Sequence, residues 1–418
     1  MKYSLSSFIL SFLVFQAFAQ HQQTDVLAEK FVKYYNTTQT DSLYSLFSED
    51  VKKALPLSNL GLAIQQFKGP LGTLLKSEFL QETTQAKSYV AKFEKSDVVL
   101  YLHFNKQNQL AGFFTGADKR QPEEPGSITV KTSDATLKGT LSVPGTGKKI
   151  PVVLLIPGSG PTDRNGNSIM INGKPNYFLK ISEALKSQNI AVLRYDKRGI
   201  GQSSTTKTET ELRFEDNVKD AVALINFLKK DARFSKIIVA GHSEGSLVGM
   251  LACKQAGADA FISIAGAGYP IDEILKTQFK TAVPPADFRT AVSLIDSVKR
   301  GLPIQTPQSP NLASTFRQSV IPYIHSWMQY KPQDEISKLK MQILILQGDN
   351  DIQVSTDNAL QLKKACPQAQ LKIIKGMSHI LKEAPADRTQ NLATYSNSNL
   401  ELHPQLIPAL SGFINGIK

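Results

Sequence analysis

The segment Gly241-His242-Ser243-Glu244-Gly245 has the pattern G-x-S-x-G and lies between two different kinds of sequence. The apolar run before it, at residues 237–240, is typical of a strand, and residues 244–255 favour a helix. A serine at such a turn has strained backbone geometry, and side chains at the glycine positions would collide with a neighbouring segment. Its hydroxyl is then exposed at a helix N-terminus, where backbone amides favour negative charge. We therefore predict that Ser243 is a nucleophile; the alternative is an ordinary glycine-rich turn.

A serine hydroxyl is a poor nucleophile near neutral pH and needs a base that removes its proton. The segment Gly376-Met377-Ser378-His379 directly follows the last apolar run, at residues 370–374. Open parallel sheets place functional groups at the carboxyl ends of their strands, so His379 is the predicted base. It would take the proton of Ser243 and return it to the leaving group. His325 and His403 are weaker candidates, and the alternative is that His379 is an ordinary loop histidine.

An acidic residue is needed to fix the tautomer of the base and to stabilise its charged form. The turn at residues 348–354 follows another apolar run and carries Asp349 and Asp351. Both aspartates therefore lie at the carboxyl end of a predicted strand. These observations alone leave both of them open as the acid.

The glycine-rich loop at residues 157–167 follows the first long apolar run of the second half of the chain. A loop at this place can direct a backbone N–H toward a developing oxyanion, with the N–H of Glu244 as the second donor. We predict Ser159 as the first donor and rank Gly160 after it; the alternative is a plain tight turn. The nucleotide-binding patterns G-x-x-x-x-G-K-[ST] and G-x-G-x-x-G before a helix are absent here.

Two groups of charged residues near these loops are predicted to be structural. Asp163 and Arg164 are neighbours in the glycine-rich loop and are expected to pair with each other. Arg198 belongs to a loop at residues 196–203, and Glu244 is a candidate for its partner.

These motifs lie at the ends of apolar runs that alternate with helical patterns from residue 127 onward. The alternation predicts a mostly parallel sheet with helices on both faces, preceded by a hairpin. It stops at about residues 268–335, where we expect an inserted helical segment that forms a lid. The predicted strands are residues 127–133, 136–143, 151–156, 190–195, 237–241, 260–265, 342–346 and 370–374.

Residues 20–118 have a different pattern and are predicted to form a small α+β domain. A mainly helical stretch at about 24–82 is followed by strand-like runs at 88–93, 98–104 and 110–114. The polar, proline-containing residues 119–126 are the predicted linker to the second domain, residues 127–418. The first domain is also a candidate module for forming a homodimer.

The start of the chain has the layout of a secretory signal peptide at residues 1–19. Lys2 is followed by the apolar run 8–15 and by Ala17-Phe18-Ala19, so cleavage is expected after Ala19. The mature protein is then expected to be periplasmic or extracellular; the alternative is a membrane anchor. Later apolar runs are shorter than about 18 residues, so no stable membrane insertion is expected after cleavage.

Composition excludes several classes of protein. The formal net charge of +12 is spread along the chain rather than gathered in a basic run, so nucleic-acid binding is not expected. Cys253 and Cys366 are too few for a disulfide framework and are expected to be buried free thiols; the alternative is that they pair with each other. The six histidines are scattered. No metal and no cofactor are therefore predicted.

Taken together, these features resemble the α/β-hydrolase family over roughly residues 127–418. The serine motif, the loop at 196–203, the acidic turn and the His379 loop occur in the order of that family. The resemblance implies the α/β-hydrolase fold and favours Asp351 over Asp349 as the acid. The loop at 157–167 looks like that of secreted bacterial carboxylesterases that carry a small extra domain in front. The His-Gly-Gly-Gly loop of lipases is absent, which argues against lipase activity.

The leading hypothesis for function is therefore a carboxylesterase that cleaves short to medium acyl esters through an acyl-enzyme. A serine peptidase or amidase uses the same chemistry and is the first alternative. A ligand-binding protein without catalytic activity, built on the same scaffold, is the second.

Overall fold

The computed structural model describes residues 23–417 except 84–85, 97, 119, 121–123, 146 and 169–172. The chain divides between residues 121 and 122 into two compact units. The predicted signal peptide lies outside the described residues, as does part of the predicted linker. Among the helices of the described residues, each is too short or too polar to cross a bilayer.

The N-terminal unit combines helices with an antiparallel sheet of strand order β1-β2-β3-β4, which confirms the predicted α+β architecture. Alternate residues of the strands point into an aromatic core, where Tyr89 and Phe104 meet Phe31 and Phe47 of the helical region. The elements are a helical segment at residues 23–36, α2 (Thr40–Tyr44), α3 (Glu49–Ala54), α4 (Leu57–Leu71), β1 (Leu74–Glu82), β2 (Ala86–Phe93), β3 (Val98–Asn105) and β4 (Leu110–Ala117).

Strand β1 corrects the sequence prediction, which placed residues 74–82 at the end of a helical stretch. Gly72, with φ of 81°, ends α4 in a conformation that favours glycine. The strand is a sheet edge, and most of its residues are exposed, so its sequence lacks a clear alternation of polar and apolar residues. Pairing with β2, rather than local propensity, therefore decides its conformation.

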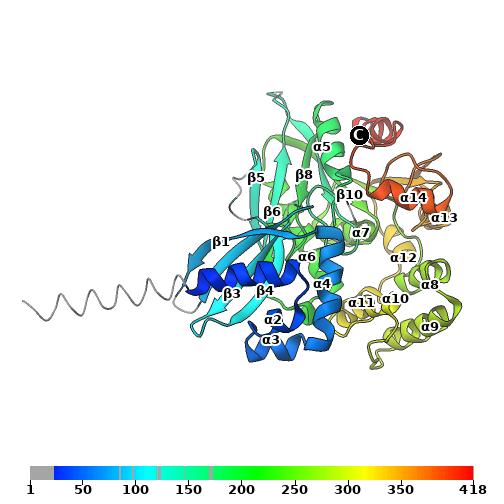
Figure 1. Ribbon diagram of the computed structural model, residues 1–418. Helices are drawn as coiled ribbons and strands as arrows, with labels where there is room; N and C mark the ends of the chain where they lie inside the picture. The colour runs from blue at the N-terminus through cyan, green and yellow to red at the C-terminus, as the bar shows by residue number, and fades with distance from the viewer. Residues whose placement is uncertain are drawn as a thin grey trace, which may run out of the picture. The chain divides into compact units, whose positions relative to one another are not determined.

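The C-terminal unit has a larger sheet, of which β5, β6, β8 and β10 are labelled in Figure 1. Its strand order is β13-β12-β11-β10-β7-β8-β6-β5. The six strands from β13 to β8 are parallel, and β6 and β5 form the predicted antiparallel hairpin at one edge. Its strands are β5 (Ser127–Lys131), β6 (Ala135–Ser142), β7 (Ile150–Ile156), β8 (Ala191–Tyr195), β9 (Ser204–Thr205), β10 (Phe234–His242), β11 (Ala260–Ile264), β12 (Gln342–Gly348) and β13 (Gln370–Ile374).

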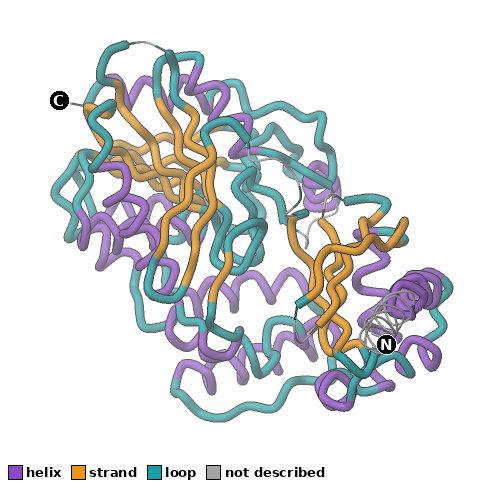
Figure 2. Tube along the Cα trace, turned by 90° about the vertical axis from the view of Figure 1, so that its left-hand side faces the viewer, coloured by secondary structure: helices purple, strands orange, loops and turns teal. Residues whose placement is uncertain are grey.

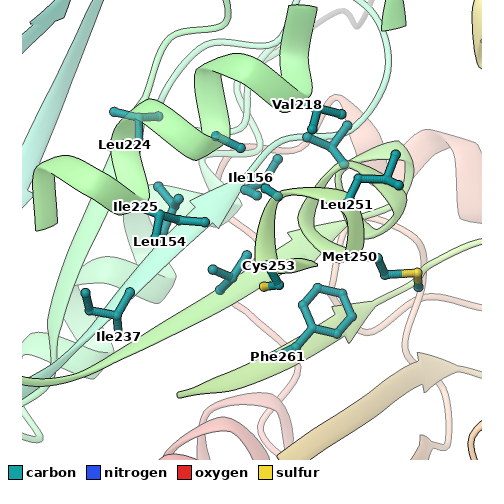
Figure 3. Packing of buried hydrophobic residues seen from close by; sticks show 14 of the residues in the cluster. Leu154, Ile156, Val218, Leu224, Ile225, Ile237, Met250, Leu251, Cys253 and Phe261 are labelled. Atoms are coloured by element: carbon teal, nitrogen blue, oxygen red, sulfur yellow. The ribbon is translucent and has the colours of Figure 1, made fainter. Parts of the chain in front are cut away.

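Helices cover both faces of this sheet, as the tube view shows (Figure 2). On one face, α6 and α7 pack on β7, β10 and β11 through apolar side chains such as Leu224, Leu251 and Phe261 (Figure 3). Burial of each such side chain contributes about 1.5–3 kcal/mol to the free energy of unfolding. The helices outside the insertion are α5 (Tyr177–Lys186), the 3-10 turn η1 (Glu209–Glu211), α6 (Phe214–Lys229), α7 (Glu244–Ala256), α13 (Thr356–Ala365), α14 (Arg388–Tyr395) and α15 (Leu406–Asn415).

A helical insertion separates β11 from β12, at the position where the sequence alternation stops. It has its own apolar cluster, which includes Ile295, Leu312 and Phe316. The helices are α8 (Ile271–Ala282), α9 (Pro285–Lys299), α10 (Pro310–Ala313), α11 (Ile321–Trp327) and α12 (Pro332–Ile336).

Candidate active site

Ser243 occupies a strained turn between β10 and α7. Its φ of 54° and ψ of −122° are rare for a residue with a side chain. A Cβ at Gly241 would lie 2.1 Å from the carbonyl oxygen of Gly245, and one at Gly245 would lie 2.3 Å from that of Ile156. The two glycines of the motif are therefore required by close backbone contacts. Ser243 is half-buried and immediately precedes the first residue of α7.

His379 lies on the loop after β13. Ser378 fixes this loop, because its N–H and its hydroxyl both donate to the carbonyl oxygen of Lys382, at 2.9 Å each. The His379 ring lies 4.8 Å, centroid to centroid, from the ring of His242, the residue before Ser243. The loop and the serine turn are therefore in direct contact.

Asp351 is the residue that meets His379. Its Oδ2 lies 2.7 Å from Nδ1 of His379. Its Oδ1 accepts the N–H groups of Gln353 and Val354 at 2.8 and 2.9 Å, and Oδ2 accepts from the Gln347 amide at 3.0 Å. Burial favours a higher pKa of Asp351, but the charge of His379 and these hydrogen bonds outweigh it, so the pKa is lowered. The ionised form of Asp351, which this lowered pKa favours, is suited to orient the imidazole of His379.

Asp349, the rival acid, has another role. Its Oδ1 accepts the N–H of Gly376 at 2.6 Å and so joins the acidic turn to the start of the His379 loop. Asp349 is exposed, whereas Asp351 is buried. The structure thus brings Asp351, and not Asp349, to the histidine.

The two weaker histidine candidates bind backbone groups. Nδ1 of His325 lies 2.7 Å from the carbonyl oxygen of Val298 within the insertion. Nδ1 of His403 accepts the N–H of Gln405 at 3.2 Å. Of these three candidates, His379 is therefore the one paired with a carboxylate.

The two N–H groups predicted for the oxyanion lie close to Ser243. Glu244 is the first residue of α7, where a backbone N–H has no acceptor within the helix. A Cβ at Gly158 would lie 3.1 Å from Cβ of Ser243, so the peptide that leads to Ser159 passes directly beside the serine. Ser159 itself is exposed, and its N–H donates to no backbone carbonyl of the described residues.

The predicted partner of Glu244 was wrong. Its carboxylate pairs with Lys197, at 3.1 Å, and not with Arg198. Arg198 instead forms a two-pronged pair with Asp220, with distances of 2.6 and 2.8 Å. The two side chains are neighbours in one loop, and only the fold decides which of them faces α7.

The predicted pair of Asp163 and Arg164 was also wrong. Arg164 binds Asp196 at 2.7 Å, while Asp163 accepts the N–H groups of Asn165 and Asn167 at 2.8 and 2.9 Å. Each side chain thereby braces the loop that carries Ser159, but through a different partner.

The sequence pattern assigns no role to His242, the variable residue of the serine motif. Its buried Nε2 lies 2.8 Å from the carbonyl oxygen of His379 and donates to it, since a carbonyl only accepts. Burial, followed by the nearby charge of His379, lowers the pKa of His242 from 6.5 to about 3. A neutral His242 therefore holds the backbone of the predicted base.

The low pKa of His242 predicts a loss of stability in acid. Below pH 6.5 the unfolded chain takes up a proton that the folded chain does not, so stability falls as the pH falls toward 3. This contribution amounts to about 2 kcal/mol between pH 6.5 and pH 5. Urea unfolding at pH 7 and pH 5 should show a smaller loss, by about that amount, in His242→Gln, which keeps an amide donor. Equal losses in both proteins would contradict this role.

The strand order, the strained serine turn and the histidine–aspartate pair at strand ends define a protein of the α/β-hydrolase class. Residues 173–384 match the family described as "Serine aminopeptidase, S33", and the chain belongs to this family of hydrolases. The resemblance that the sequence motifs predict is therefore confirmed. Residues 28–113, in the N-terminal unit, match a family described as "Protein of unknown function (DUF3887)".

The chain is similar to proteins named as esterases. It is 24% identical to esterase EstD of Thermotoga maritima over 394 residues, which is 88% of each chain. The structure of Est1E from Butyrivibrio proteoclasticus with ferulic acid shares 16% identity, with a TM-score of 0.46 over 69% of this chain and 96% of that one. An esterase of Pyrococcus furiosus shares 15% identity, with a TM-score of 0.46 over 69% and 90% of the two chains.

Proposed function

We propose that the protein is a serine carboxylesterase with Ser243 as nucleophile, His379 as base and Asp351 as the orienting acid. The observation that carries the proposal is the 2.7 Å contact between Nδ1 of His379 and Oδ2 of Asp351. The ring of His379 also contacts the ring of His242, the residue before Ser243. The similarity to esterase EstD over 88% of both chains supports an ester as the substrate.

The proposed reaction has two halves. Oγ of Ser243 bonds to the ester carbonyl carbon while His379 takes the serine proton, and the carbonyl oxygen becomes an oxyanion. The N–H groups of Ser159 and Glu244 donate to that oxyanion. The bond to the alcohol then breaks, and the alcohol leaves with the proton from His379. Water repeats the sequence on the acyl-enzyme, which releases the carboxylic acid and restores Ser243.

A peptidase or amidase is the second candidate, because the family description names a serine aminopeptidase. The same groups serve both reactions, but an amide needs its amine leaving group to be protonated before the bond breaks. The choice between ester and amide therefore depends on a direct comparison of substrates.

The deciding experiment uses two substrates that differ only in the scissile bond, 4-nitrophenyl butyrate and butyryl 4-nitroanilide. We expect labelling of the purified protein by a fluorescent fluorophosphonate and a kcat/KM at least about tenfold higher for the ester. Nitrophenyl esters of rising chain length then define the acyl preference, which we propose is short to medium. Equal or faster cleavage of the anilide, or of alanine 4-nitroanilide, would favour the peptidase. Absence of both labelling and turnover would favour a binding protein.

We also propose that the protein is exported, on the basis of the signal-like residues 1–19. The N-terminal sequence of the protein recovered from cell fractions tests this proposal. A mature chain that begins at Gln20 outside the cytoplasm is the expected result, and an intact N-terminus in the cytoplasm would contradict it. A homodimer through residues 20–118 stays a prediction for sedimentation analysis.

A further inference from the structure

A cluster of buried polar side chains surrounds the carboxylate of Glu244, the residue that follows Ser243. Glu244 is 4% exposed, and its Oε1 accepts from Lys197 at 3.1 Å, from Tyr323 at 2.9 Å and from Asn217 at 3.4 Å. Tyr323 belongs to α11 of the insertion, and Asn217 to α6. The side chain of one proposed oxyanion donor thus joins three separate parts of the domain.

The second contact of Lys197 reaches the other proposed donor. Its Nζ donates to the carbonyl oxygen of Gly158 at 3.0 Å. That oxygen belongs to the same peptide group as the N–H of Ser159. A trans peptide is planar, with its C=O and N–H on opposite sides, so a fixed carbonyl also fixes the direction of the N–H. A buried ammonium on the oxygen further polarises the peptide and strengthens its N–H as a donor.

The position of Lys197 depends in turn on its partner. Lys197 is 8% exposed, and a buried ammonium is stable only when it is paired and hydrogen-bonded. Glu244 supplies the charge, and Tyr323 and Asn217 hold the carboxylate in place. Burial, followed by the charge of Glu244 and its hydrogen bond, raises the pKa of Tyr323 well above its usual value, so its hydroxyl remains a donor.

We propose that Lys197 is a positioning residue for the oxyanion hole, and that Tyr323 couples this position to the helical insertion through Glu244. The proposal rests on the proposed function of Ser243. Its consequence is that the insertion influences the chemical step itself, because it holds the carboxylate that fixes Lys197 and the peptide before Ser159.

The insertion provides a matched control in Tyr330. Its hydroxyl donates to Glu215 of α6 at 2.8 Å, so it also links the insertion to a carboxylate, but not to Glu244. Tyr323→Phe and Tyr330→Phe each remove one hydroxyl from a tyrosine–carboxylate bond. Any difference between them therefore reports the connection to the oxyanion hole rather than the general anchoring of the insertion.

The experiment compares five full-length proteins: wild type, Lys197→Met, Lys197→Arg, Tyr323→Phe and Tyr330→Phe. For each protein it measures kcat and KM for 4-nitrophenyl butyrate, inhibition by butylboronic acid, and the melting temperature. The boronate forms a tetrahedral anion on serine and so reports stabilisation of the oxyanion. We expect Lys197→Met to lower kcat about 100-fold, close to the loss of one oxyanion donor, with KM changed less than about threefold. Lys197→Arg restores part of this loss, and Tyr323→Phe lowers kcat about five- to tenfold. Boronate affinity falls in parallel with kcat.

Three outcomes would overturn the proposal: a kcat of Lys197→Met close to that of wild type, equal losses of kcat in the two tyrosine variants, or an unchanged boronate affinity. If Lys197→Met does not fold, the tyrosine pair decides alone. Fluorophosphonate labelling of wild type distinguishes a failure of the proposed function from a failure of the proposed role of Lys197. An unlabelled wild type contradicts the proposed function, whereas a labelled wild type with unaffected variants contradicts only the role of Lys197.

Discussion

Ser243→Ala is expected to abolish covalent labelling by a fluorophosphonate and to lower kcat for 4-nitrophenyl butyrate roughly 10⁴- to 10⁶-fold. The variant lacks the oxygen that forms the acyl-enzyme, so only substrate binding and the oxyanion donors remain. Its fold should be preserved. Alanine removes a half-buried hydroxyl that donates no hydrogen bond to another of the residues that the structure describes. Labelling, turnover and melting temperature of the purified variant are the measurements.

A matched control for this prediction is Ser246→Ala. The hydroxyl of Ser246 lies one helical turn further along α7, where it is buried and bonded to the Ser263 hydroxyl at 2.7 Å. Its removal is expected to cost stability, about 1 kcal/mol, but not labelling. Ser243→Ala that is still labelled, or Ser246→Ala that is not, would place the nucleophile elsewhere.

Asp351→Asn has the second largest expected effect, a loss of about 10⁴-fold in kcat. The two backbone N–H groups on Oδ1 select the amide oxygen of the new side chain for that position. The amide nitrogen must then face Nδ1 of His379 and the amide of Gln347, where the carboxylate had accepted from both. Nδ1 becomes an acceptor and Nε2 carries the proton, so His379 is the wrong tautomer to receive a proton from Ser243.

Asp349→Asn is the control on the same turn. An asparagine oxygen can still accept the N–H of Gly376, so kcat is expected to stay within about threefold of wild type. Steady-state kinetics of the two variants, with melting temperatures to show that both are folded, decide between the acids. A larger loss in Asp349→Asn would contradict the assignment of Asp351.

The serine motif illustrates what is readable from sequence. Gly241 and Gly245 are needed because the backbone passes within 2.1–2.3 Å of where their side chains would begin. Such contacts are local to one turn and its neighbouring strand, so they leave a fixed spacing in the chain. The parallel strands can also be recognised in the sequence as long apolar runs, because both faces of each strand are buried.

The sequence by itself therefore determined the fold class, the strained serine turn and the two strand ends that carry His379 and Asp351. Only the tertiary structure decided that Glu244 pairs with Lys197 rather than Arg198. For His379, the family resemblance favoured Asp351 over Asp349, and the contact itself is seen only in the tertiary structure. It also decided that residues 74–82 form an edge strand. The physical reason is the same in each case. These choices depend on partners that are distant in the chain, and local spacing and propensity carry no information about which partner the fold brings close.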